Sequence, residues 1–212
     1  MNIEKTMENL RKNNMDAYFA ETKEVALALV KSLLEKGETV GVGGSVTLNE
    51  AGVLELLRNG DYNFLDRYKE GLVRAEVTDI FRKSFFADSY ITSSNAITEE
   101  GELYNVDGNA NRVAAMLFGP SSVIVIAGKN KIVENLKAAE KRVKTIAAPL
   151  NVKRLGLTTY CSEKGVCMGA EDEKLCAGCM SDDRICAGYT IMARQRIKGR
   201  VKVIIVNENL GY

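Results

Sequence analysis

Two hydrophobic patterns alternate along the chain. Short apolar runs are typical of buried strands, and longer runs with an apolar residue at every third or fourth position are typical of amphipathic helices. The strand pattern occurs in residues 15–20, 39–42, 62–65, 122–127 and 199–206. The helical pattern occurs in residues 3–12, 22–36, 48–57, 69–86, 109–117 and 131–147. This alternation predicts an α/β fold with a largely parallel sheet flanked by helices.

The remaining sequence departs from this alternation in two places. Residues 87–98 begin like a strand and become polar, and a turn at 100–102 leads to a second strand at 103–106, which predicts a hairpin. Residues 158–188 are rich in cysteine, glycine and acidic residues and show little periodicity. We expect a single domain over residues 1–212, with this Cys-rich segment placed before the last strand.

Glycines and hydroxyl residues directly follow the predicted strand 39–42. Gly43 and Gly44 allow a sharp turn and a close approach to a ligand. Ser45 and Thr47 either cap the next helix or donate hydrogen bonds to a bound anion. A strand, a glycine-rich turn and a helix in this order favour anion binding. The same residues also fit a tight, capped turn that binds nothing, because short glycine-rich patterns are common.

Two further polar segments are expected beside this turn. Ligands of open parallel sheets bind beyond the carboxyl ends of the strands, which places residues 93–95 and 107–112 on the same rim. Asn95 and Arg112 are therefore candidate ligand-binding residues, since arginine pairs with two oxygens at once. The alternative for Arg112 is an exposed position on a helix.

The amino-acid composition limits the kinds of partner and of chemistry that we expect for this protein. The 212 residues carry a net charge of +1 and are 46% hydrophobic, which predicts a real core and no general attraction to nucleic acid or membranes. No apolar run is long enough to span a membrane, so a cytoplasmic protein is expected. The chain has no histidine, so acid–base chemistry would depend on carboxylates, Lys, Tyr, Cys or a cofactor.

All five cysteines lie in the Cys-rich segment, which indicates metal or redox chemistry before structural disulfides in a cytosolic protein. Four thiolates around a C-x2-C core suit zinc or an iron–sulfur cluster. The preferred ligands are Cys161, Cys176, Cys179 and Cys186, with Cys167 as the alternate. The other interpretation is a set of reduced thiols or disulfides.

Several of these stretches, taken together, resemble the lactate-utilisation (LUD) domain family. They are residues 41–47, 63–68, 96–101, 105–109, 111–114, 128–133, 184–186 and 203–211. The resemblance implies the fold shared by ribose-5-phosphate isomerase, glucosamine-6-phosphate deaminase and CoA transferases. It also implies a role in bacterial oxidation of L-lactate to pyruvate, beside iron–sulfur partner proteins.

The resemblance bears on the carboxylates and the cysteines. In sugar-phosphate isomerases of this fold, acidic residues near the rim move protons, and Glu50 and Asp107 stand at similar places. Their alternatives are a helix-dipole partner for Glu50 and a turn residue for Asp107. Similar proteins show C-x5-C-x2-C-x6-C, whereas an extra stretch, residues 168–175, makes either Cys167 or Cys176 surplus here.

Three function classes follow. The leading hypothesis is a LUD-family component of lactate or related hydroxy-acid oxidation that binds a small anionic metabolite at the glycine-rich turn. The second is a stand-alone isomerase or transferase that uses Glu50 and Asp107, and the third is a non-enzymatic metabolite-binding protein. A homo-oligomer is compatible with all three. The Lys- and Glu-rich face of residues 131–144 is expected to be solvated, and Lys129 to be structural.

Overall fold

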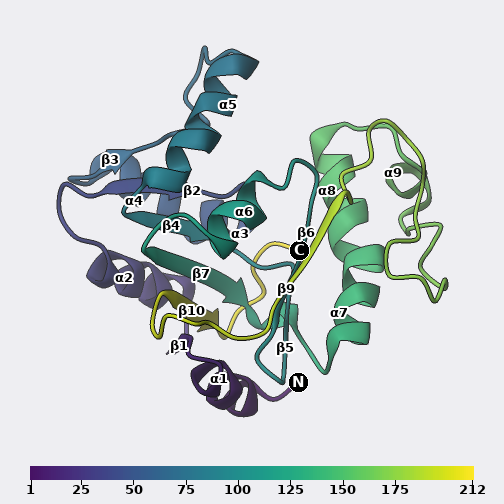
Figure 1. The fold of residues 1–212 in the computed structure, drawn as a ribbon, viewed down its shortest axis with the longest axis horizontal. Helices are drawn as coiled ribbons and strands as arrows, with labels where there is room; N and C mark the ends of the chain where they lie inside the picture. Colours follow the sequence, from purple (N-terminus) through teal and green to yellow (C-terminus); the bar gives the residue numbers. More distant parts are fainter.

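A six-stranded parallel sheet forms the centre of the molecule (Figure 1). The computed structural model describes all residues, 1–212. The strand order across the sheet is β1 (Asp16–Ala20), β10 (Val201–Val206), β7 (Ser122–Gly128), β4 (Ser89–Thr92), β2 (Thr39–Val42) and β3 (Asn63–Phe64). All five neighbouring pairs are parallel. The predicted α/β fold with a largely parallel sheet and flanking helices is confirmed.

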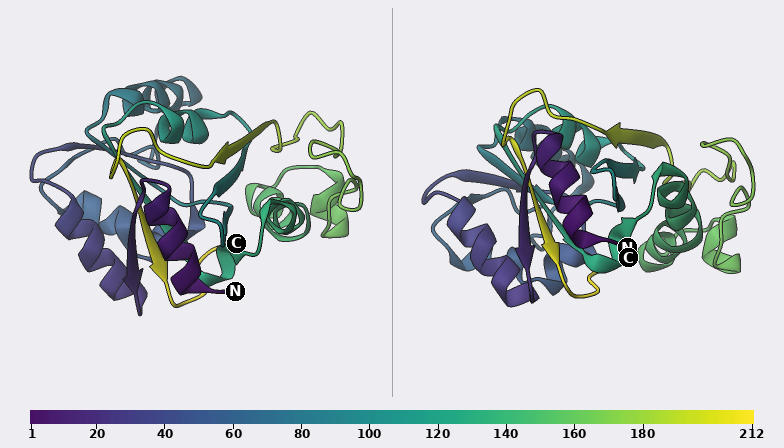
Figure 2. Two further views of the ribbon diagram at one scale, coloured as in Figure 1. Left: turned by 60° about the horizontal axis from the view of Figure 1, so that its bottom comes forward. Right: turned by 90° about the horizontal axis from the view of Figure 1, so that it is seen from below.

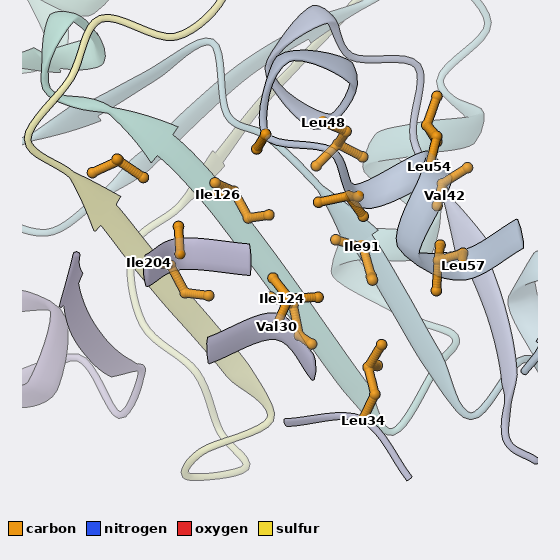
Figure 3. Close-up of a cluster of buried hydrophobic side chains, with 14 of the residues drawn as sticks. Val30, Leu34, Val42, Leu48, Leu54, Leu57, Ile91, Ile124, Ile126 and Ile204 are labelled. Atoms are coloured by element: carbon orange, nitrogen blue, oxygen red, sulfur yellow. The ribbon is translucent and has the colours of Figure 1, made fainter. Parts of the chain in front are cut away.

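Alternating side chains give this sheet two buried faces. Ile124 and Ile126 of β7 face one core, and Val123 and Val125 face the other, because successive strand residues point to opposite sides. The first core is covered by α2 (Lys23–Leu33), α3 (Val46–Glu50) and α4 (Val53–Asn59), as Figure 3 shows. The second is covered by α1 (Ile3–Lys12) and α6 (Asn111–Leu117), and Figure 2 shows α1 lying along β1 and β10.

A smaller sheet lies to one side and carries its own helices. Its order is β8 (Ile132–Val133), β5 (Ala96–Thr98), β6 (Leu103–Asp107) and β9 (Gly188–Met192). β5 and β6 form the predicted antiparallel hairpin. A third apolar cluster joins this sheet to the run of α7 (Leu136–Arg142), η3 (Val143–Ala147) and α8 (Ala148–Leu155).

The helix predicted over residues 131–147 differs from the structure at both ends. Lys131 lies in the short turn η2 (Lys129–Lys131), and the helical run begins only at Leu136. It continues past Pro149 to Leu155, because proline is tolerated in the first turn of α8. The expected solvated charged face is only partly present, since Glu134, Lys137 and Lys141 are exposed whereas Lys131, Arg142 and Lys144 are buried.

Two other predicted helices are shorter than the sequence suggested. The helix at residues 48–57 is divided by Gly52, which takes a left-handed conformation at φ 73° and separates α3 from α4. The helix at residues 69–86 begins at Arg74 as α5 (Arg74–Lys83) and closes with the turn η1 (Ser84–Phe86).

The Cys-rich segment is mostly irregular, as its lack of periodicity suggested. It contains one short helix, α9 (Tyr160–Lys164), and extends beyond α8 at the edge of the molecule (Figure 1). The strand β9, which follows it, was not predicted. None of the helices combines the length and apolar character needed to cross a bilayer.

Candidate functional site

A polar cleft of about 260 Å³ lies beyond the carboxyl ends of the strands, between the main sheet and α8. Residues following β2, β3, β4, β6 and β7 line it, and α8 and the C-terminal Tyr212 complete the wall. The three segments expected on one rim all contribute, through Gly44 to Thr47, Ser93 to Asn95 and Asp107 to Arg112. This position agrees with the rule for ligand sites in open parallel sheets.

The charges in this cleft are strongly unbalanced. Arg67, Arg112, Lys131 and Arg154 line it, and Asp107 is the one lining residue with a carboxylate side chain. The net charge of the whole chain is only +1, so positive charge is concentrated at this site. A cleft with an excess of cations draws anions from solution.

Lys131 lies on the floor of the cleft without a carboxylate partner. Its side chain is only 3% exposed. Its Nζ donates to Thr47 Oγ1 at 2.8 Å and to Ser93 Oγ at 3.0 Å, and it forms no salt bridge. Burial, with the neighbouring Arg142 and Arg112 cations, lowers the pKa of Lys131 to about 7, and Glu50 opposes this weakly. A buried ammonium ion without a counter-ion is expensive unless an anion joins it.

Arg67, which follows β3, and Arg154, which lies on α8, bring positive charge to the cleft without a carboxylate partner. The Arg67 guanidinium stacks 4.4 Å from the Phe81 ring centroid and makes no hydrogen bond or salt bridge. Arg154 of α8 donates from Nε to Tyr212 Oη at 2.7 Å and from Nη2 to Asn151 Oδ1 at 2.8 Å. Neither guanidinium has a carboxylate partner, so both retain their charge for a ligand.

Arg112 joins the cleft segments to one another. Its two terminal nitrogens donate to four oxygens, on Ser93, Asn95, Asn105 and Val106. Its Nε lies 3.3 Å from Asp107 Oδ2. With its donors engaged inside the protein, Arg112 contributes charge and shape to the cleft. Asn95 Oδ1 accepts from both Arg112 and Val106 N, so Asn95 is held in the same network.

The glycine-rich turn is fitted closely against this network. A Cβ on Gly43 would lie 2.5 Å from Thr92 Oγ1 and 3.1 Å from Arg112 Cγ, so only glycine fits there. Gly44 is exposed and faces the tip of Arg67. Ser45 does not cap α3 with its side chain. Thr47 Oγ1 is fully buried and bonds to Lys131 and to Leu210 O.

The two candidate carboxylates lie in different places. Asp107 lines the cleft, and its buried Oδ2 has no hydrogen bond although Arg112 Nε lies within ion-pair distance. Glu50 is exposed outside the lining, and its Oε2 accepts from Gly211 N at 2.6 Å. The structure therefore does not bring Glu50 and Asp107 together in one cleft.

The cysteines occupy a separate region beside α8 and β6. All five are free thiols. Cys161, Cys167, Cys179 and Cys186 line one small cavity, and Cys176 is exposed outside it. Burial and the neighbouring thiols raise the pKa of Cys186 to about 11. No three metal-ligating side chains are arranged around a common point.

Three cationic residues of the cleft were not among the sequence candidates. Arg67 and Lys131 each lie three residues after the end of a strand, β3 and β7, so a search for basic residues shortly after each parallel strand would have found them. Arg154 gives no such signal, because the packing of α8 alone brings it to the cleft.

Comparisons with known proteins found similar solved structures and one matching family. A DUF162 family protein from Deinococcus radiodurans has a similar structure, with a TM-score of 0.50, 14% identity and coverage of 98% of this chain and 99% of that one. Ribose 5-phosphate isomerase from Plasmodium falciparum gives a TM-score of 0.33 at 19% identity, over 53% of this chain and 52% of that one. No curated protein sequence matches. The LUD domain matches residues 3–206, and the chain therefore belongs to the LUD domain family.

Proposed function

We propose that this LUD-family protein binds a small anionic metabolite in the cationic cleft and acts in the oxidation of lactate or a related hydroxy acid. The observation that carries the binding proposal is Lys131, a buried ammonium group in an open cleft with no carboxylate partner. The hydroxy-acid role is supported by the family to which the chain belongs.

The cleft fits a small ligand with a carboxylate or phosphate group. A volume of about 260 Å³ accommodates a short carboxylic acid or a small phosphorylated compound, at the lower limit of typical ligand pockets. Lys131 supplies a point charge at the floor, and Arg67 supplies a planar guanidinium that pairs with two oxygens of one anion.

Calorimetric titration with L-lactate, pyruvate and ribose 5-phosphate tests the binding proposal. At pH 6.5 we expect measurable binding of at least one of these anions and a loss of roughly tenfold or more in Lys131→Met, since a charge-assisted contact is removed. Lys129→Met is the matched control, because Lys129 bonds to Asn207 outside the cleft lining. Equal affinities in the two variants would contradict the proposal.

One observation favours a second candidate, an isomerase or transferase. Asp107, whose Oδ2 lies 3.3 Å from Arg112 Nε, lines the same cleft as Lys131, so this cleft holds both a carboxylate and an amine as candidate groups for proton transfer. Glu50 would not take part directly, because it lies outside the cleft lining. Turnover of ribose 5-phosphate that disappears in Asp107→Asn would establish this candidate, and binding without turnover would remove it.

A further inference from the structure

The cleft cations that have no carboxylate partner lie on different walls. Lys131 is on the floor, where its Nζ donates to Thr47 and Ser93. Arg67 follows β3 and Arg154 lies on α8, and these two elements are on opposite sides of the molecule (Figure 1). A ligand that engages all these charges therefore has to reach from one wall of the cleft to the other.

The guanidinium of Arg67 is held in place but left uncovered. One face stacks on Phe81, 4.4 Å from the ring centroid, and its N–H groups make no hydrogen bond within the protein. Gly44, which lines the same cleft, has no side chain to cover it, since a Cβ there would lie only 3.3 Å from Arg67 Nη1. A free guanidinium edge donates two parallel hydrogen bonds to a carboxylate or a phosphate.

Arg154 is oriented in a different way, by neutral acceptors. Its Nε donates to Tyr212 Oη at 2.7 Å, and its Nη2 donates to Asn151 Oδ1 at 2.8 Å. Tyr212 Oη also donates to Asn151 Oδ1 at 3.1 Å, so the three side chains bond to one another. These contacts fix the direction of the guanidinium without neutralising it, and they leave Nη1 for a ligand.

A single anionic group neutralises too little of this charge. Arg112 already has Asp107 beside its Nε at 3.3 Å, whereas Lys131, Arg67 and Arg154 form no salt bridge. A monocarboxylate such as lactate can balance the charge of only one of these three cations. The remaining two would repel each other in a confined cleft. A ligand with a second anionic group relieves this repulsion.

The lining of the cleft also indicates a ligand with two charged ends. A carboxylate that pairs with both Lys131 and Arg67 uses both of its oxygens, so Arg154 on the facing wall needs another group. Only six of the 21 lining residues are hydrophobic. The middle of the ligand therefore meets polar side chains, which suit hydroxyl groups better than an alkyl chain or an aromatic ring.

We propose that the ligand is a short hydroxy acid with a second anionic group, a carboxylate or a phosphate, and that Arg154 binds this second group. Lys131 and Arg67 hold the first carboxylate at the other end. This inference rests on the proposed function, because it divides the anion site described there into two ends.

Calorimetric titrations with two matched pairs of compounds test the proposal. L-Malate is L-lactate with a second carboxylate, and 3-phospho-D-glycerate is D-glycerate with a phosphate. The titrations are made at pH 6.5, below the pKa of about 7 of Lys131, so that its ammonium group is charged. We expect the doubly charged member of at least one pair to bind roughly tenfold or more tightly than its partner, since a charge-assisted contact is added. The pair that shows the preference identifies the second group.

Variants of α8 locate the site of the second group. Arg154→Gln should raise the dissociation constant of the preferred compound roughly tenfold or more and that of its monoanionic partner by less than about threefold. Lys131→Met should weaken both members of the pair alike, because both keep the first carboxylate. Lys153→Gln is the matched control, since it removes the same charge from the next residue of α8, which is exposed and outside the cleft lining. It should keep the preference.

The contrary outcomes separate this proposal from the proposed function. Equal affinities within both pairs would overturn the proposal and leave the anion site intact. A preference that persists in Arg154→Gln, or that falls equally in Lys153→Gln, would show that Arg154 does not bind the second group. Binding of none of the four compounds would also overturn it, and only if pyruvate and ribose 5-phosphate fail to bind as well is the proposed function lost.

Discussion

At the scale of single residues, the cleft is defined by cations without partners. Lys131 is buried against two hydroxyls, and Arg67 is stacked on Phe81 without a hydrogen bond. The burial of Lys131 is unfavourable for the protein alone, since a charge removed from water needs a counter-charge, whereas Arg67 is only partly buried and is held by its stacking. Such residues are typical of sites selected for binding at some expense of stability.

Lys131 should make stability depend on pH in a defined window. Its pKa is lowered to about 7 in the folded state from 10.5, so between these values the unfolded chain binds more protons. The destabilisation is therefore complete below pH 7 and is relieved as pH rises toward 10.5. Relative to Lys131→Met, the native protein should gain about 2 kcal/mol in unfolding free energy between pH 7 and pH 9.

Urea denaturation at several pH values measures this difference, since contributions from other groups cancel between the two proteins. The charged groups nearest Lys131 are Arg142 and Arg112, which lower its pKa, and Glu50, which raises it. Parallel stability curves for the native protein and Lys131→Met would show that the lysine titrates normally.

Arg67 should contribute to anion affinity and little to stability. Arg67→Gln removes a free guanidinium from the cleft, and we expect the dissociation constant to rise about tenfold. The unfolding free energy should change by less than about 1 kcal/mol, because only the stacking on Phe81 and Tyr68 is lost. Arg74→Gln, outside the cleft lining, is the control, and the same affinity in both variants would show that Arg67 does not contact the ligand.

At the scale of elements, the cleft depends on how the ends of strands are tied together. Arg112 of α6 bonds to the segment after β4 and to β6, and the close fit of Gly43 brings the turn after β2 against the same side chain. Three elements that are distant in sequence are thereby held at one point, which fixes the shape of the cleft before any ligand arrives.

Replacement of Arg112 should therefore lower the unfolding free energy more than replacement of an exposed arginine does. Arg112→Lys keeps the charge but cannot span four oxygens on different elements, and we expect a loss of about 3 kcal/mol in unfolding free energy. Arg154→Lys is the matched control, because Arg154 is exposed, and it should change stability by less than about 0.5 kcal/mol. Comparable losses in both variants, measured by urea denaturation, would mean that Arg112 does not organise the cleft.

At the scale of the whole molecule, local pattern predicted the fold better than the site. The apolar runs at residues 39–42, 122–127 and 199–206 mark three central strands, because strands buried on both faces are continuously hydrophobic. β9, by contrast, lies in a mixed and partly exposed sequence, and its pairing with β6 depends on contacts distant in the chain.

The sequence predicted only those cleft residues that directly follow a predicted strand. The turn after β2, Asn95, Asp107 and Arg112 follow predicted strands, and the structure brings them to one cleft. Lys131 was assigned to a solvated helix because its charge dominated the local pattern, although burial places it on the cleft floor. Arg154 reaches the cleft through the packing of the α7–α8 run, which no local spacing in the sequence records.

The most direct test of the central claim is an NMR titration of the Lys131 side chain, assigned by comparison with Lys131→Met, with and without a bound small anion such as L-lactate. Without the anion we predict a midpoint near the pKa of about 7, and a clear upward shift when the anion binds beside the ammonium group. A midpoint near the ordinary lysine value of 10.5 that does not respond to any of the tested anions would contradict an anion site built on Lys131.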